Sequence, residues 1–393
     1  MYLFTLNTIN SVPKIAMTDK NEMTDYFERK NKGFLKKQKF RLKHKLGWLG
    51  VPQVIPYRGF GSYASGEATI TGALYEDKGL EKPEGKNSSH ENILAMLKRY
   101  SGDQIPGARI KIYLGNEQKQ RLTEENGIFK ATMPLNEMNG EQNTKWIPYQ
   151  AELLDQIGPE KNNFRVPGEI LIPGKDAAFG VISDIDDTIM ISHSTQTLRK
   201  LRLMLTHNSR TRKPFPGVEA FYRALHQGAN ENSNNPFFYL SSSEWNLYDL
   251  IDDFCAYNQF PKGVYLLREI NPGLLNLWKQ DGGNHEHKLD KIIRLFKTYP
   301  KLPFVLVGDN GQHDPEIYAR VARIFPQRIK AIYIRTVRKR KDQHMKKLIA
   351  EMEELNVQMV FTPDTINAAQ HAQSINLIAE SAVKPIIENS FTD

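Results

Sequence analysis

Cysteine and long apolar runs are the scarcest features of this sequence. Its 393 residues include one cysteine, Cys255, so no disulfide can form within the chain. No stretch approaches the roughly 18 consecutive apolar residues that span a bilayer. The opening residues lack the basic segment and apolar core of a secretory signal. These absences predict a cytoplasmic protein in which Cys255 is a small buried core residue.

Two familiar catalytic motifs are also missing. The sequence contains no G-x-S-x-G elbow and no G-x-x-x-x-G-K-[ST] phosphate loop. Serine hydrolase and P-loop nucleotidase mechanisms are therefore disfavoured.

Positive charge is in excess, with 53 Lys and Arg against 45 Asp and Glu and a net charge of +8. A basic protein prefers anionic partners, which include nucleic acid, acidic lipid and phosphorylated substrates. Residues 28–50 concentrate this charge, and their spacing predicts a helix with a basic face and a leucine face. Such a helix can lie on an anionic membrane. The alternative is a linker helix packed on its own domain. The leucines are Leu35, Leu42, Leu46 and Leu49.

The chain divides by pattern into four parts. Residues 1–50 form a basic, partly disordered segment. Residues 51–175 alternate apolar and polar residues with a period of two, as in Ala68, Ile70 and Leu74, which predicts an antiparallel β-sandwich with one short helix at 90–100. Asn126-Gly127 predicts a hairpin turn. The runs PGARIKIYL and T-x-E-N-G-x-F resemble the transthyretin-like sandwich.

Residues 176–345 change pattern to short buried strands followed by helical spacing. Strands are expected at 237–240, 263–267 and 304–307. Strand and helix in alternation predict a parallel sheet covered on both faces. Beyond it, residues 346–393 have helical spacing and predict a helical tail. The helical face expected there contains Met345, Leu348, Met352 and Leu355.

The stretch FGVISDIDDTIMI, residues 179–191, is the strongest candidate site. An apolar strand leads into Asp184 and Asp186, which we expect on one face roughly 6 to 7 Å apart. Two like charges so placed repel, unless a cation lies between them or one carboxyl keeps its proton. The alternative interpretation is a polar turn that caps a helix.

Polar signatures also follow the other predicted strands. Ser241 follows residues 237–240, and Asp309 and Asp314 follow residues 304–307, while Lys288 begins a helical segment. Ligands of parallel sheets bind beyond the carboxyl ends of the strands, so these side chains are expected to meet. Taken singly, Ser241 could be a helix N-cap and Lys288 a solvated surface charge.

In this order, the motifs resemble the haloacid-dehalogenase superfamily of aspartate-nucleophile phosphotransferases. Within it, YLSSS-x-WNLYDL, HK-x-D-KI and GDNGQHDPEIY look like the actin-patch-associated phosphatidate phosphatases. The resemblance covers roughly residues 50–345 and implies a Rossmann-like parallel-sheet catalytic domain behind the β-sandwich. Glu244 departs from the pattern, because proline is expected after the serines.

The resemblance also implies roles for the site residues. Asp184 would attack phosphorus, and Asp186 would protonate the leaving oxygen and later accept a proton from water. Thr188 would fix the turn, and Ser241 and Lys288 would contact phosphoryl oxygens. The implied cofactor is Mg²⁺, which prefers carboxylates and phosphate oxygen. Its expected ligands are Asp184, Asp186 through the backbone carbonyl, Asp309 and Asp314.

The implied function is a magnesium-dependent phosphatidate phosphatase at an anionic membrane surface, with phosphatidate as substrate and no nucleic-acid partner. The sequence also predicts a light cap with helical segments at 195–205 and 218–225. Basic residues occur in this cap and after the last strand. Such an open, basic site suits a phosphate displayed on a surface. One alternative is the same chemistry on phosphoprotein or nucleic-acid ends. Another is a non-catalytic membrane-binding scaffold. The basic residues are Arg199, Lys200, Arg202, Arg210, Arg212, Lys213, Arg335, Arg338, Lys339, Arg340 and Lys341.

Overall fold

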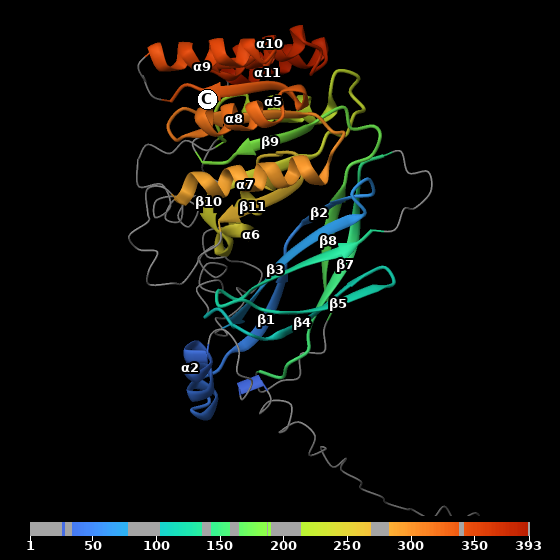
Figure 1. The fold of residues 1–393 in the computed structure, drawn as a ribbon, viewed down its shortest axis with the longest axis vertical. Coiled ribbons are helices and arrows are strands. Elements are labelled where there is room, and N and C mark those ends of the chain that lie inside the picture. Colours follow the sequence, from blue (N-terminus) through green and yellow to red (C-terminus); the bar gives the residue numbers. More distant parts are fainter. Residues whose placement is uncertain are drawn as a thin grey trace, which may run out of the picture.

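Two β-sheets organise the computed structural model, one built from the first half of the chain and one from the second (Figure 1). The structure describes residues 26–27, 34–77, 103–135, 143–157, 165–186, 188–189, 214–268, 283–337 and 342–391. The helices expected at 90–100 and 195–205 lie outside these residues, as do the basic residues expected in the cap and residues 338–341.

The first sheet has eight strands and confirms the period-two pattern. In β4, for example, Ile110, Ile112 and Leu114 are buried and alternate with half-buried residues. The strands are β1 (Val51–Pro56), β2 (Gly59–Ser62), β3 (Glu67–Asp77), β4 (Arg109–Leu114), β5 (Glu117–Leu122), β6 (Ile128–Pro134), β7 (Lys145–Leu153) and β8 (Arg165–Ile172).

The sheet is mixed, whereas the sequence predicts an antiparallel one. Its order is β1-β3-β2-β8-β7-β4-β5, with β6 paired to β3, and β2 runs parallel to β8. Because β6 also contacts β5 at the far end of this path, the sheet curls around an apolar core of its own. Asn126-Gly127 does form a turn, with Gly127 at φ +72°. The hairpin prediction is wrong, however, because β5 pairs with β4 and β6 with β3.

The second sheet has six parallel strands, β9 (Gly180–Asp184), β10 (Phe237–Glu244), β11 (Gly263–Arg268), β12 (Phe304–Asp309), β13 (Ile329–Arg335) and β14 (Met359–Thr362). Their order, β11-β10-β9-β12-β13-β14, is that of an open, doubly wound sheet. The first strand, β9, therefore lies at the centre, and the direction of winding changes between β9 and β12.

Helices cover both faces of this sheet, as the alternation of strand and helix predicts. Val181 points into one core and Ile182 into the other. The Val181 side is covered by α5 (Val218–Gln227), α6 (Tyr248–Tyr257), α10 (Thr365–Ser374) and α11 (Val383–Phe391), and the Ile182 side by α7 (Gly283–Thr298), α8 (Asp314–Ile324) and α9 (Asp342–Glu354). Cys255 is a buried core residue, as expected, and burial raises the pKa of its thiol to about 12.

The helical tail expected over 346–393 contains a strand. Leu348 and Met352 of α9 are buried, which confirms the predicted helical face. After a connection of four residues, however, β14 pairs in parallel with β13 and extends the sheet. The end of the described chain is therefore built into the second sheet and its cover.

Helix α2 (Phe34–Lys45) confirms the helix expected within 28–50, but a different face is buried. Phe40 and Lys37 are buried, while Leu42 and Leu46 are about half exposed, at 59% and 48%. Lys43 lies 2.6 Å from the buried carboxylate of Glu76 and also pairs with Asp103. The helix is thus tied to the first sheet, as in the linker-helix alternative. Of the leucines expected on one face, Leu42 and Leu46 are exposed and Leu49 is buried. No helix among the described residues is long and apolar enough to cross a bilayer.

Arg58 joins the two sheets. Its guanidinium makes a two-pronged bond to Asp252 of α6, at 2.6 and 2.9 Å, and its backbone N–H donates to the Tyr248 hydroxyl at 2.9 Å. Tyr57 stacks on Trp245, with ring centroids 4.6 Å apart. This contact lies on the α6 side of the second sheet, so the junction of the two bodies includes a partly buried ion pair and an aromatic stack.

Removing the acidic partner of this pair should destabilise the protein. In Asp252→Asn the largely buried Arg58 loses its charge partner, and we expect the free energy of unfolding to fall by about 2 kcal/mol. Urea denaturation measures the loss. Asp290→Asn, which changes an exposed carboxylate on α7, is the control and should stay within about 0.5 kcal/mol of wild type. Equal stability of the two variants would contradict the assigned role.

Candidate active site

The carboxyl ends of three neighbouring strands bring the candidate residues together. Asp184 ends β9, Asp309 ends β12, and Ser241 lies near the end of β10. Because β9 lies between β10 and β12, these side chains meet at one edge of the sheet, beside the point where the winding direction changes. Ligands of doubly wound sheets bind at this position.

Lys288 lies at the centre of the cluster. It reaches in from α7, and its Nζ is 2.6 Å from Asp184 Oδ1 and 2.9 Å from Asp314 Oδ1. All three side chains are at least 93% buried. Lys288 is therefore a buried bridging cation, and the surface-charge alternative is excluded.

The pKa values reflect this crowding of buried charge. Burial raises the pKa of Asp184 well above its ordinary value, the nearby carboxylates of Asp314, Asp186 and Asp309 raise it further, and Lys288 opposes them. Burial alone would lower the pKa of Lys288, but Asp184 and Asp314 raise it above its ordinary value. Lys288 stays charged at neutral pH, and Asp184 depends on nearby positive charge to ionise.

Three carboxylates could hold a metal ion. One oxygen each of Asp184, Asp309 and Asp314 lies within 4.8 Å of the others, and all three residues are buried. Asp184 Oδ2 has no hydrogen-bond partner among the described residues, although it is inaccessible to water. A buried carboxylate oxygen without a donor is costly unless a cation meets it. A hard divalent ion such as Mg²⁺ fits this set of oxygen donors.

Asp186 lies outside that group of three. Its Oδ2 accepts hydrogen bonds from Ser241 Oγ at 3.1 Å and from the Ser242 N–H at 3.0 Å. Strand β9 ends at Asp184, so the strand alternation that predicted Asp184 and Asp186 on one face does not extend to Asp186. The Asp186 side chain therefore binds Ser241 and Ser242 and does not belong to the three-carboxylate group.

Ser241 belongs to a strand, which excludes its alternative role as an N-cap. Strand β10 continues to Glu244, opposite Arg268, and α6 begins only at Tyr248. The pairing with β11 shifts register between Leu240 and Glu244. This irregular stretch presents the Ser242 N–H to Asp186.

Thr188 and the turn after β12 hold Asp309. Thr188 Oγ1 donates to Asp309 Oδ2 at 3.4 Å, while the N–H groups of Gly311 and Gln312 donate to Oδ1 at 2.5 and 3.2 Å. The Asp309 carboxylate is thereby fixed toward the centre of the site.

Sequence reasoning missed two contributors to this site. The Ser242 N–H was not considered, because backbone donors leave no residue-type signal. Arg335 was counted only as part of a basic run. It ends β13, lies 3.3 Å from the ring centroid of Phe215, and lines a small pocket with Thr188. Burial lowers the pKa of Arg335 to about 10, so it remains charged at neutral pH.

Comparisons with known proteins match the stretch of the chain that carries this cluster. Residues 179–336 match the family model of the catalytic domain of phosphatidate phosphatase APP1. The match spans the strands that carry Asp184, Ser241 and Asp309 together with Lys288. It confirms the resemblance to the phosphatidate phosphatases over this segment.

Two curated relatives each match less than half of the chain. Phosphatidate phosphatase APP1 of Saccharomyces cerevisiae is 35% identical over 157 residues, which are 40% of this chain and 25% of the relative. An uncharacterised protein of Schizosaccharomyces pombe is 28% identical over 193 residues, which are 48% of this chain and 30% of the relative. The aligned parts thus span about a quarter to a third of these curated relatives.

Solved structures add no argument about function. A carbohydrate acetylesterase from Xanthomonas citri aligns over 86% of this chain and 74% of its own, with 10% identity and a TM-score of 0.26.

Replacing the central cation, Lys288, by a neutral residue should destabilise the protein. In Lys288→Met, Asp184 and Asp314 lose their shared partner, and we expect the free energy of unfolding to fall by about 3 kcal/mol in EDTA. Millimolar Mg²⁺ should restore part of the loss, because a bound cation again compensates the carboxylates. Urea denaturation with and without Mg²⁺ measures both effects. Lys297→Met, on the exposed side of α7, is the control. A loss below about 1 kcal/mol, or no response to Mg²⁺, would argue against the cation site.

Proposed function

We propose that this chain is a magnesium-dependent phosphatidate phosphatase of the haloacid-dehalogenase type that acts at a membrane surface. The observation that carries the proposal is the match of residues 179–336 to this catalytic domain, in which the buried Asp184 pairs with the central Lys288. The doubly wound strand order supports a Rossmann-like catalytic domain. Phosphatidate would be converted to diacylglycerol and phosphate.

The reaction would proceed through an ester on Asp184. A carboxylate oxygen of Asp184 attacks phosphorus, the bond from phosphorus to the glycerol oxygen breaks, and Asp186 supplies a proton to that leaving oxygen. Water then attacks the aspartyl phosphate, Asp186 accepts its proton, and phosphate leaves with Asp184 restored. Splitting the displacement into two steps is the advantage of a nucleophilic carboxylate.

The surrounding residues would hold the reacting groups in place. Lys288 fixes Asp184 Oδ1 and offers its charge to the phosphoryl oxygens, while Ser241 and the Ser242 N–H orient Asp186. Asp184, Asp309 and Asp314 are the residues that would hold Mg²⁺. The ion, when bound, supplies positive charge between the carboxylates and the phosphoryl group.

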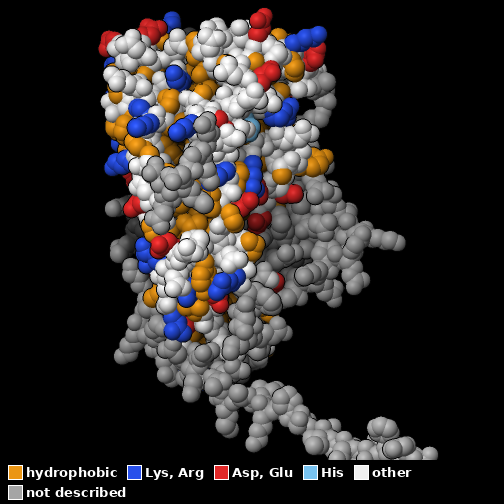
Figure 2. Space-filling view, turned by 90° about the vertical axis from the view of Figure 1, so that its right-hand side faces the viewer, with side chains coloured by type: hydrophobic (Ala, Val, Ile, Leu, Met, Phe, Trp, Pro, Cys, Tyr) orange, Lys and Arg blue, Asp and Glu red, His pale blue; other side chains and the backbone are white. Residues whose placement is uncertain are grey.

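Support for a lipid surface comes from composition and from α2. The net charge is +8, and exposed Leu42, Leu46 and Trp48 lie beside the exposed Arg41 and Lys45. Apolar and basic side chains at one place suit an anionic membrane. On the face shown in Figure 2, by contrast, basic side chains are interspersed with hydrophobic and acidic ones. The end of α2 is therefore the better-supported contact surface.

Neutralising the proposed nucleophile separates catalysis from binding. We expect Asp184→Asn to lose at least about 10³-fold in phosphate release from phosphatidate vesicles with Mg²⁺, because the amide cannot form the ester. Binding to the vesicles, measured by co-sedimentation, should be unchanged. Asp290→Asn should retain full turnover. Wild-type protein that binds vesicles but releases no phosphate would favour the scaffold alternative.

A substrate panel tests the lipid. At matched salt, we expect phosphate release from phosphatidate in mixed vesicles to exceed release from phosphopeptides and from 5′-phosphorylated oligonucleotides, and EDTA to abolish it. Faster turnover of either soluble substrate would shift the proposal to phosphoprotein or nucleic-acid ends while leaving the chemistry of Asp184 intact. Activity that persists in EDTA would remove the magnesium requirement.

A further inference from the structure

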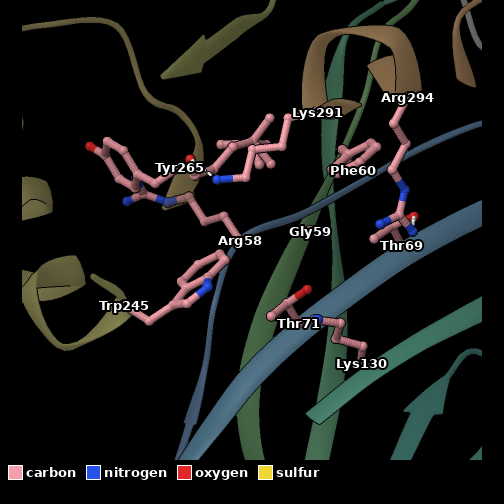
Figure 3. Close-up of a pocket in the computed structure, with 12 residues that line it drawn as sticks. Arg58, Gly59, Phe60, Thr69, Thr71, Lys130, Trp245, Tyr265, Lys291 and Arg294 are labelled. Atoms are coloured by element: carbon pink, nitrogen blue, oxygen red, sulfur yellow. Dashed lines mark hydrogen bonds between the residues drawn. The ribbon is translucent and has the colours of Figure 1, made fainter. Parts of the chain in front are cut away.

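A pocket lined by basic side chains, separate from the candidate active site, lies at the junction of the two sheets (Figure 3). The first sheet supplies Arg58, Phe60, Thr69 and Lys130, and the second body supplies Trp245 and Tyr265 together with Lys291 and Arg294 of α7. None of these residues belongs to the candidate active site. The pocket is nevertheless built on two elements of that site, because Trp245 directly follows β10 and α7 carries Lys288.

Positive charge dominates the lining. Four basic side chains line the pocket, and no Asp or Glu is among the lining residues. The charge of Arg58 is already compensated by Asp252, and Lys130 lies 3.5 Å from a carboxylate oxygen of Glu124. Arg294 has no carboxylate within ion-pair distance in the described part of the chain, where it contacts the Thr69 hydroxyl at 3.0 Å and the ring of Phe60. An anion is the ligand that such a lining attracts.

Trp245 provides an independent sign of a ligand. Its side chain is 8% exposed, yet Nε1 has no hydrogen-bond partner among the described residues. In Figure 3 the nitrogen lies on the side of the indole ring that faces Thr71 and Lys130. A buried N–H group without an acceptor is costly and uncommon in native proteins. The pocket therefore offers no acceptor to Trp245 Nε1 among the described residues, and its lining carries no negative charge.

We propose that this pocket binds a phosphoryl oxyanion, carried by a phospholipid headgroup or free in solution. Guanidinium, ammonium and indole groups are all donors, and a phosphoryl group offers several charged acceptor oxygens at once. The cavity volume is about 60 Å³, and one water needs roughly 10–15 Å³ on the same measure, which leaves room for about four to six water-sized groups. A phosphoryl group has that size.

The test observes the Trp245 indole directly. The four tryptophans give four indole N–H signals in ¹⁵N-labelled full-length protein, and Trp245→Phe, or elimination using Phe variants of the other three, assigns the one from Trp245. The protein carries Asp184→Asn and is kept in EDTA, so that neither turnover nor metal-dependent binding at the active site contributes. The titrants are inorganic phosphate and a short-chain phosphatidate below its micelle concentration. Sodium chloride and short-chain phosphatidylcholine are the controls.

We expect phosphate or phosphatidate, but neither control, to shift the Trp245 signal. Arg294→Gln should weaken the apparent affinity about tenfold, since it removes a charged hydrogen-bond donor. Lys297→Gln, an equal charge change on the same helix but outside the pocket, should leave the affinity unchanged. A response to phosphatidate alone would identify the headgroup as the source. No response to either titrant, an equal response to the controls, or a response indifferent to Arg294→Gln would overturn the proposal. Because no turnover is measured, this outcome is independent of the proposed phosphatase activity.

Discussion

The buried ion pairs of Lys288 with Asp184 and Asp314 are the constraint on which the rest of the candidate site depends. Removing three charged groups from water costs several kcal/mol for each, and only close mutual contact offsets that cost. The contacts of 2.6 and 2.9 Å require α7 to lie against the end of β9 and the start of α8. The packing of α7 and α8 on one face of the sheet therefore sets the positions of the charged side chains in the site. A small displacement of either helix would leave a carboxylate buried without its partner.

The same crowding leaves negative charge at the site that Lys288 does not fully compensate among the described residues. Lys288 contacts one oxygen of Asp184, while the other, Oδ2, is buried and has no donor in the described residues. Asp309 brings another carboxylate to within 4.8 Å. A phosphoryl group would add further negative charge. The electrostatics of the described residues therefore support the proposed divalent cation.

The sequence predicted the features that depend on local residue patterns. It missed those that depend on contacts with residues far away in the chain. Strands β9, β10 and β12 were found because strands buried on both faces are continuous apolar runs, and their polar ends identified Asp184, Ser241 and Asp309. Strand β14 is only four residues long and lies between helices, so its pattern is too short to detect. The face of α2 was misjudged because Lys37 and Lys43 are satisfied by distant groups, and helical spacing does not reveal such partners. Pairing of β6 with β3 across the chain likewise overrode the local hairpin signal.

Helix α7 relates the active site to the basic pocket at the sheet junction. At 100° per residue, steps of three residues turn by about 60° around a helix and rise about 4.5 Å, so Lys288, Lys291 and Arg294 form a slanting row. The row begins buried among carboxylates at Lys288 and ends exposed above Phe60 at Arg294. One helix can therefore present cations to two separate anions about 9 Å apart along its axis. Asp184 and Asp314 fix the end of α7 that carries Lys288. An anion bound at Arg294 would therefore contact a helix whose position the active site already requires.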